Sequence, residues 1–370
     1  MVAGHPPPAR GRLVRRLALL VGATVAVGFG SVLLLLGGGL VPATVQIPFR
    51  ATLQILLHQL SLGRLFPQPC AGTAALPSQC ASWTAIVWKL TLPEVLLAMI
   101  VGAGLGISGA TLQGIFRNPL VDPYLLGIAT GGSLGVAVVE VYGILPARAY
   151  LLDPAAAFVG GVATGLAVLL AARGRSTSVE TLLLAGVAIS YLLSGVLSLV
   201  LLYNPVRAEQ LTSWLLGGLL SGYWPSDTVA FALVLVLGGL LGLYGRELNL
   251  LQLGPEVAQS AGVDARRVRV EVLLLASLLT AGVVAFTGVI GFVGLVSPHI
   301  VRRWLGTDYR LVVPASGVVG ALFLVAANDA ASLSFPHSVL PVGIFTALAG
   351  VPFFLVLLYR HRRRSFGGGP

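Results

Sequence analysis

Charged residues are scarce in this chain. Only 10% of its 370 residues are Asp, Glu, Lys or Arg, whereas 56% are hydrophobic and the mean hydropathy is +0.93. A soluble protein of this length needs a polar surface that this composition cannot provide. The scarcity of charge therefore excludes an ordinary soluble protein and predicts an all-α, polytopic membrane protein.

Lysine is almost absent, since Lys89 is the only one. It follows the residues SWTAIVW, so the chain contains no phosphate-binding loop of the form GxxxxGK[ST] and cannot be a P-loop ATPase on its own. The net charge of +10 does not indicate a nucleic-acid partner, because the arginines form short blocks between apolar runs. Such blocks are typical of membrane topology signals.

The chain has only two cysteines, Cys70 and Cys80, which enclose nine residues. Two cysteines are too few for a four-ligand metal site, and we expect no metal on this chain. Their segment is predicted below to lie outside the cell, where disulfides persist. We therefore predict a disulfide between them, with two free thiols as the alternative.

Long uncharged runs predict the membrane helices, since one span needs about 20 apolar residues. The first run, Leu17–Leu40, follows a basic head like that of a signal peptide, but it has no clear cleavage site and is expected to be retained. The segment Val41–Val87 is rich in proline and is predicted to be an extracytoplasmic loop with one short helix. The later runs are Val95–Phe116, Tyr124–Val139, Pro154–Ala172, Thr181–Tyr203, Thr228–Gly245, Val272–Val301, Leu311–Asn328 and Ser338–Tyr359.

The run Val272–Val301 is too long for one straight span and too short for two full ones. Its interruption at Thr287–Gly294 is either a kink within one helix or a turn between two. A turn gives ten spans and leaves 18 of the 23 lysines and arginines inside the cell, whereas a kink leaves 11 inside and 12 outside. Because short internal loops carry the excess of positive charge, we predict ten spans with both termini in the cytosol.

The stretch Gln113–Gly127, which reads QGIFRNPLVDPYLLG, is predicted to be a sharp polar turn between two spans. Pro119 and Pro123 forbid a continuous helix, because each lacks an N–H and restricts the residue before it. Pairs of glycines four residues apart are expected to let helices pack closely rather than to line a pathway. These pairs are Gly102/Gly106, Gly131/Gly135, Gly161/Gly165 and Gly238/Gly242.

Several long motifs occur in order between about Leu92 and Leu358. They are LPEVLLAMIVGAGLGISGATLQGIFRNPLVDPYLLG from Leu92, STSVETLLLAGVAISYLLSGVLS from Ser176, LNLLQLGPEVAQSAGVDARRVR from Leu248, GFVGLVSPHIVR from Gly291 and LPVGIFTALAGVPFFLVLL from Leu340. With these motifs the chain resembles the FecCD/BtuC-type permeases, which are the transmembrane subunits of ATP-binding-cassette importers for iron-siderophores, haem and vitamin B12.

The resemblance implies a single transmembrane permease domain over residues 1–370 with the type II importer fold, in the inner membrane of a prokaryote. It implies a homodimer, two ATPase subunits that bind ATP and Mg²⁺, and an extracytoplasmic substrate-binding protein. The chain itself would catalyse no reaction and bind no cofactor. The implied cargo is a bulky metal chelate, either iron-siderophore or haem, with cobalamin as the alternative.

Site residues carry over only where motifs match. The cytosolic segment 248–269 resembles the part that docks into the ATPase, although it could be an ordinary loop. Its coupling candidates are Leu253, Gly254, Pro255, Glu256, Ala258, Ala261 and Gly262. The cytosolic gate of the vitamin B12 member matches Asn118, Pro119, Leu120, Ser176, Thr177 and Ser178, where Ser178 also suits a helix N-cap. Pathway candidates are Gln113, Ser190, Tyr191, Ser194 and Ser198.

The chain departs from the family where the binding protein usually docks. It reads LTLPE where many members read LRLPR, so Thr91 and Glu94 replace arginines, and Leu333 replaces the arginine that follows Asp329. The usual charged docking pairs are therefore expected to be missing. Lys89, Arg50 or Arg64 could replace them, or docking could use the loop 41–87.

Two other classes of function share individual features with this sequence. Gly106–Gly109 matches the GxSG motif of rhomboid proteases, but none of the five histidines lies in the middle of a span, where a partner for Ser108 is required. A proton-coupled transporter needs an acid at the membrane midplane. Glu94, Glu140 and Asp329 all lie near span ends and are expected to be interfacial, which disfavours that class.

Overall fold

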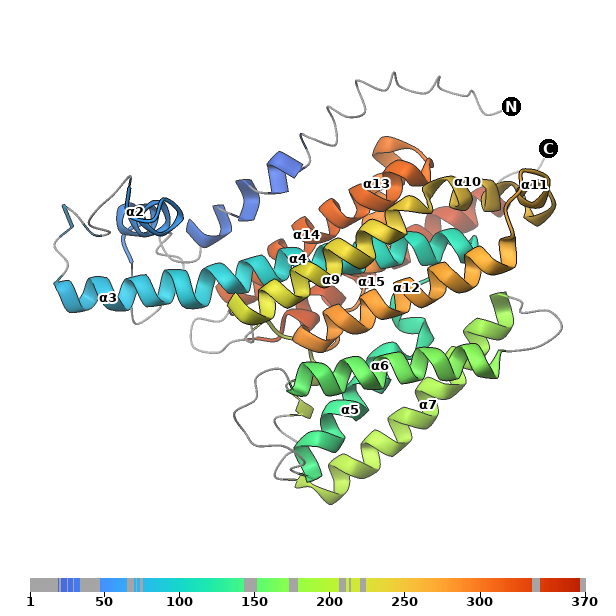
Figure 1. Cartoon of the computed structure of the whole chain (residues 1–370), viewed down its shortest axis with the longest axis horizontal. Helices are drawn as coiled ribbons and strands as arrows, with labels where there is room; N and C mark the ends of the chain where they lie inside the picture. The colour runs from blue at the N-terminus through green and yellow to red at the C-terminus, as the bar shows by residue number, and fades with distance from the viewer. Residues whose placement is uncertain are drawn as a thin grey trace.

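The protein is a bundle of α-helices whose longest member runs through its centre (Figure 1). The computed structural model describes residues 47–64, 76–142, 152–172, 179–205, 224–334 and 340–366, with parts of 19–33, 70–73 and 211–219. These residues form no strand. The helices are α2 (Phe49–Leu60), α3 (Pro77–Ala85), η1 (Ile86–Thr91), α4 (Leu92–Phe116), η2 (Pro123–Leu126), α5 (Ile128–Tyr142), α6 (Leu152–Ala171), α7 (Val179–Tyr203), α9 (Trp224–Leu243), α10 (Gly245–Leu253), α11 (Pro255–Ser260), α12 (Ala265–Thr287), α13 (Val293–Leu305), α14 (Tyr309–Ser334) and α15 (Val342–Phe366).

Six helices in the described residues are long and apolar enough to cross a membrane, and they include α4, α6, α7, α9, α12 and α14. Three shorter apolar helices lie at Val21–Leu33, Ile128–Val141 and Val342–Leu357. Together with α13 these elements match the predicted ten, and the prediction of an all-α, multi-pass membrane protein is confirmed.

The interruption after α12 is a turn between two helices. Gly288 (φ 68°) ends α12 and Phe292 (φ 69°) precedes α13, so neither residue continues a right-handed helix. However, α12 begins at Ala265 rather than at Val272, because the Asp264 carboxylate accepts hydrogen bonds from the first backbone N–H groups of the helix. The start predicted from hydropathy was therefore wrong by seven residues.

The helix that contains the second predicted span also begins well before the uncharged run Val95–Phe116. The helix continues without a break from Pro77 through α3, η1 and α4 to Phe116, which is 40 residues or about 60 Å. Lys89 and Glu94 interrupt the apolar run in the sequence, but the helix continues through both residues. The π-helical turn η1 comes directly before Pro93, where the regular i→i−4 bonding fails. The segment Val41–Val87 therefore holds α2 and α3 rather than one short helix.

The α3 end of this long helix extends beyond the bundle, and α2 lies beside it (Figure 1). Ile55 and Leu56 of α2 are fully buried, and α2 contacts η1. A disulfide joins Cys70 to Cys80, which lies on α3, with a Cα–Cα distance of 6.0 Å. The two short helices and the disulfide lie together at one end of the long axis, and the buried side chains of α2 join the same core as those of α4.

Close backbone contacts along α4 hold the centre of the bundle together. A Cβ atom on Gly106 would lie 2.1 Å from the Ser316 carbonyl oxygen of α14, and one on Gly109 would lie 1.9 Å from the Gly294 carbonyl oxygen of α13. Gly102 meets the Gly320 carbonyl in the same way. In lipid, apolar area alone does not drive helices together, so this close approach supplies the packing contacts that do.

The other glycine pairs divide into two groups. Gly131 and Gly135 of α5 approach the backbone of α6, as the packing interpretation predicts. Gly238 meets only the side chains of Ile107 and of its own helix, and no atom lies within 4 Å of a Cβ atom built on Gly242. The α9 pair therefore does not bring two helix backbones together.

We predict that Gly106→Ala destabilises the protein by about 1 to 3 kcal/mol, because the new methyl group has no space against the Ser316 carbonyl. Gly195→Ala on α7 is the matched control, since nothing lies within 4 Å of its Cβ position. There the better helix propensity of alanine should leave stability equal or raise it by up to about 1 kcal/mol. Thermal unfolding in detergent measures both, and equal melting temperatures for the two variants would contradict the central role of this contact.

Candidate functional site

The polar turn between α4 and α5 is built by two side-chain caps. Arg117 adopts a left-handed conformation (φ 52°) and ends α4. The Asn118 Oδ1 atom accepts a hydrogen bond from the Leu120 N–H at 2.9 Å, and the Asp122 Oδ1 atom accepts one from the Tyr124 N–H at 2.9 Å. Asparagine and aspartate favour such local turns because their short side chains reach the backbone two residues on. The chain reverses here, as the sequence predicts.

Three gate candidates lie at the surface of this turn. Pro119 is exposed, and Asn118 and Leu120 are partly exposed. Their side chains are therefore available to a second molecule, although the amide oxygen of Asn118 already holds the turn. The other gate candidates, Ser176–Ser178, lie outside the described residues.

Gln113 is buried beneath the turn, with 1% of its surface exposed. Its Nε2 atom donates to the carbonyls of Val121 (3.2 Å) and Gly294 (3.3 Å), and its Oε1 atom accepts a hydrogen bond from Arg302. The amide thus joins α4, the turn and α13. Gln113 therefore holds the turn from inside, and its role in a pathway stays a prediction.

The other pathway candidates lie on α7. Tyr191 is 77% exposed, and Ser194 and Ser198 are exposed on the same helix. Ser190 donates to the Gly186 carbonyl and lies against Gly127 at the end of the turn. Three of the four candidates therefore line an open, largely apolar face, whereas Ser190 packs between α7 and the turn.

The coupling segment consists of two short helices at the end of the bundle opposite α3 (Figure 1). Gly254 separates α10 from α11 with φ 123°, and Gly262 follows α11 with φ 80°, so both positions favour glycine. Leu253 is 67% exposed. Five further candidates, namely Gly254, Pro255, Glu256, Ala261 and Gly262, are at least partly exposed. Ala258 is fully buried and serves packing.

One exposed residue of this segment was missed in the sequence. Val257 of α11 is apolar and 46% exposed, four residues after the exposed Leu253. Its position in the first turn of a short helix, directly after Glu256, could have indicated that it is exposed. Together Leu253 and Val257 give the segment two apolar side chains that the described residues leave uncovered.

Two hydrogen bonds tie the coupling segment to the gate turn. The Arg117 guanidinium donates to the Gln252 carbonyl at 3.0 Å, and the Gln252 side-chain amide donates to the Gly114 carbonyl at 2.8 Å. Gln252 thereby uses both its backbone and its side chain to contact the end of α4. Sequence reasoning missed this pair, because the two residues are 135 positions apart.

A second set of bonds joins α10 to the start of α14. The Asn249 side chain donates to Asp308 at 2.6 Å and accepts a hydrogen bond from the Tyr309 N–H at 2.9 Å. The same Asp308 carboxylate accepts from the Arg310 N–H at 3.0 Å. Hydrogen bonds therefore hold α10 against both the end of α4 and the start of α14.

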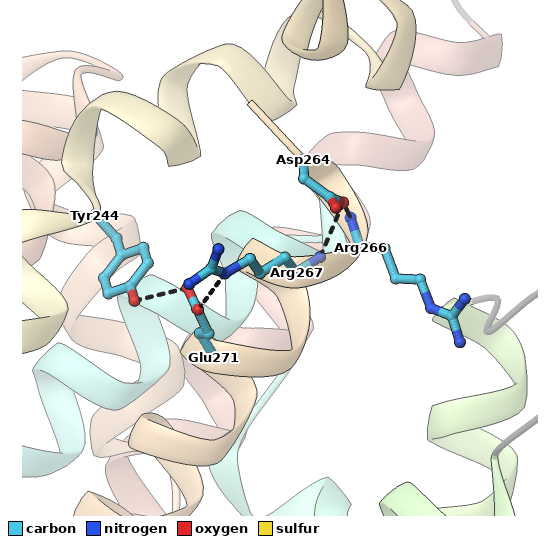
Figure 2. A network of polar contacts seen from close by, with 5 residues as sticks. All are labelled: Tyr244, Asp264, Arg266, Arg267 and Glu271. Carbon is cyan, nitrogen blue, oxygen red and sulfur yellow. Dashed lines mark hydrogen bonds and ion pairs between the residues drawn. The ribbon is translucent and has the colours of Figure 1, made fainter. Parts of the chain in front are cut away.

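The base of the coupling segment is closed by a polar network (Figure 2). Tyr244, between α9 and α10, donates its hydroxyl to Glu271 of α12 at 2.9 Å. Arg267 donates to the other oxygen of Glu271 at 2.8 Å, and Asp264 caps the start of α12. Arg267 is largely exposed, so this ion pair contributes little to stability. The network holds Tyr244, where the chain leaves α9, against α12, where the chain returns to the bundle.

The acids and the serine that bear on the other classes of function lie in packed surroundings. Ser108 is fully buried and donates to the Ala276 carbonyl at 3.4 Å, which does not suit a nucleophile. Glu94 accepts a hydrogen bond from Asn328 at 3.0 Å, and Asp329 accepts one from Ser31. Within the described residues, no group of three or more His, Cys, Asp or Glu side chains could hold a metal.

The sequence profile of the FecCD transport family matches residues 31–360. The chain belongs to this family. It is 38% identical over 285 residues to the hemin transport system permease of Yersinia pestis, covering 76% of this chain and 85% of the relative. It is 41% identical over 274 residues to the cobalamin import system permease of Halobacterium salinarum, covering 74% and 73%.

A solved structure of a metal-chelate type ABC transporter in an inward-facing conformation matches with a TM-score of 0.68 and 29% identity. The match covers 84% of this chain and 97% of that one. The family predicted from the motifs is therefore confirmed, and the chain is a FecCD-type transport permease.

Asp122 in the turn of this FecCD permease has a raised pKa. Desolvation raises the pKa of its carboxyl from 3.8 to about 6, and the backbone N–H groups of Tyr124 and Phe292 oppose the rise. Because the folded value lies above the unfolded one, the folded chain binds more protons between about pH 4 and pH 6. The stability that Asp122 contributes therefore falls as the pH rises through this window.

Asp122→Asn should remove this dependence, since asparagine does not titrate but can still accept from Tyr124. We predict that the wild-type free energy of unfolding falls relative to the variant by about 1 to 3 kcal/mol between pH 4 and pH 7. Thermal unfolding in detergent across this range measures the difference. Parallel pH profiles for the two proteins would contradict the assignment.

Proposed function

We propose that this chain is the membrane-spanning subunit of an ATP-driven importer for a bulky metal chelate. The observation that carries the proposal is the pair of bonds from Gln252 to the end of α4, because it connects an exposed docking segment to a turn at the end of the bundle. One named relative is a hemin permease and the other a cobalamin permease, so both cargoes have support, and we keep haem or iron-siderophore as the first expectation and cobalamin as the alternative.

The mechanism we infer is alternating access. Two ATPase subunits bind ATP and Mg²⁺ and dock on α10 and α11, where Leu253 and Val257 are exposed. Movement of these helices pulls on the end of α4 through Arg117 and Gln252 and changes the position of Asn118–Leu120. The permease itself forms and breaks no covalent bond.

A second copy of the chain would cover the open face of α7. The exposed side chains Tyr191, Ser194 and Ser198 would then line the path between two subunits. Asparagine, leucine and serine suit a gate for large cargo, because they can pack across a two-fold axis and separate without leaving a buried charge.

The arginine distribution supports a cytosolic position for both termini and for α10 and α11, in the inner membrane of a prokaryote. The opposite end, with α2 and α3, would then face the substrate-binding protein. Glu94 and Asp329 are acids that accept hydrogen bonds from Asn328 and Ser31, so they cannot replace the missing docking arginines. Arg50, Arg64 and Lys89 remain for that contact.

The function is tested by reconstitution of the permease in proteoliposomes with its ATPase subunits and binding protein. We expect uptake of haem or an iron-siderophore only when ATP and the ATPase are present. Uptake driven by a proton gradient without the ATPase would instead establish a secondary transporter.

The gate is tested by the double variant Asn118→Ala, Leu120→Ala. We predict that ATP hydrolysis continues while transport per ATP falls at least about tenfold, or that the path leaks, because the turn loses both its cap and its packing surface. ATPase activity and uptake are measured on the same vesicles. Wild-type coupling would reduce the stretch to a structural turn.

The connection between the docking segment and the gate is tested by Arg117→Met. Methionine is similar in length to the apolar stem of arginine but has no N–H group to donate to the Gln252 carbonyl. We predict a three- to tenfold fall in transport per ATP, on the order of the 0.5–1.5 kcal/mol of one hydrogen bond, with the basal ATPase rate retained. Arg303→Met, at an exposed position on α13 and outside segment 248–269, is the control. An equal effect of both substitutions would show that only surface charge matters.

A further inference from the structure

A groove of about 690 Å³ runs along one side of the bundle between α4, α9 and α14, with Val21 and Thr24 of the N-terminal helix at its edge. The α4 residues that line it recur at helical spacing, so they form one continuous face. Nearly all lining side chains are apolar. This side of the molecule takes no part in the proposed gate or docking segment.

Three glycines leave open space along the α9 side of the groove. Gly238, Gly239 and Gly242 all line it, and no atom lies within 4 Å of a Cβ atom built on Gly239 or Gly242. Small residues in membrane helices ordinarily bring two backbones together. Here the described helices leave the space beside them open.

One charged side chain, Asp227, lies in this apolar wall. It is 3% exposed, and neither carboxylate oxygen has a hydrogen-bond partner among the described residues. A buried carboxylate without a partner is strongly unfavourable, so a donor or a cation from outside the described residues is expected to meet it. The orphaned carboxylate thus indicates a ligand with a positively charged or donor group.

Two tryptophans indicate how deep Asp227 lies in the membrane. The Trp224 indole donates to the Trp88 carbonyl at 3.0 Å, and the two rings lie 4.9 Å apart. Tryptophan is enriched where membrane and water meet, and Asp227 lies in the first turn of α9 beside Trp224. The carboxylate is therefore at the level of lipid headgroups, and the glycines lie deeper.

We propose that the groove binds a membrane phospholipid whose primary ammonium headgroup pairs with Asp227 and whose acyl chain lies along α9 towards Gly239. The distance between these residues along the helix is about 18 Å, which suits a chain that crosses half of a hydrocarbon core of about 30 Å. An ammonium group supplies both the charge and the hydrogen-bond donors that the carboxylate lacks. Phe231, one turn further and 55% exposed, can change rotamer to admit the headgroup.

The chemistry discriminates between headgroups. A choline headgroup carries the charge but no N–H donor, and an anionic glycerol headgroup would bring a second negative charge to the site. Phosphatidylethanolamine is therefore the expected occupant. The full-length protein is purified from membranes that contain phosphatidylethanolamine, phosphatidylcholine and phosphatidylglycerol, and the retained lipids are quantified by native mass spectrometry.

We expect phosphatidylethanolamine to be retained preferentially, and Asp227→Asn to lower this preference about tenfold, as for loss of a hydrogen bond to a charged group. Asp227→Glu keeps the carboxylate and should keep the preference. Equal retention of the three lipids by the wild-type protein, or an unchanged preference in Asp227→Asn, would overturn the proposal.

Occupancy of the groove is tested separately by Gly239→Leu, since Gly239 lines the groove and no atom lies within 4 Å of its Cβ position. We expect loss of the retained lipid, while Gly195→Leu on α7, which also has open space but lies outside the groove, should retain it. Retention of the same lipid by Gly239→Leu would show that it binds elsewhere and would overturn the site.

Discussion

The close approach of backbones around α4 is the constraint on which the rest of the structure depends. In a membrane, apolar surface gains nothing by leaving lipid for protein, so helices must be held by contacts that only short distances allow. Gly102, Gly106 and Gly109 permit such contacts with α14 and α13. These three helices form the centre to which the other elements attach, and they also fix the position of the turn at the end of α4.

Polar side chains act where helices end. Gln113 donates to the carbonyls of Val121 and Gly294, Arg117 donates to that of Gln252, and Gln252 donates to that of Gly114, so these bonds connect segments that are distant in sequence. Each bond contributes on the order of 0.5–1.5 kcal/mol, and together they restrain how α4, α10 and α13 lie against one another. The same bonds join α10 to the end of α4, and this is the connection on which the proposed coupling rests.

The surface of the bundle is divided between faces with different expected partners. The face of α7 is open and carries a tyrosine and serines, the α10–α11 end carries apolar side chains at a polar surface, and the groove beside α9 carries a single orphaned acid. Each face exposes groups that this chain alone does not cover or pair. We expect a second subunit on the face of α7, an ATPase at α10 and α11, and a lipid in the groove beside α9.

Hydropathy, charge bias and turn residues in the sequence determined the fold class, the helix break after Thr287 and the reversal at Pro119, and the motifs between Leu92 and Leu358 determined the family. They could not fix the start of the helix that enters α4, because Lys89 and Glu94 look like a boundary although the backbone bonding continues through them. Nor could they distinguish Gly106, which touches another backbone, from Gly242, which faces open space. Hydropathy cannot make this distinction, since lipid and protein interior are equally apolar. Only the tertiary structure decided which residues face protein, because that depends on neighbours more than a hundred positions away.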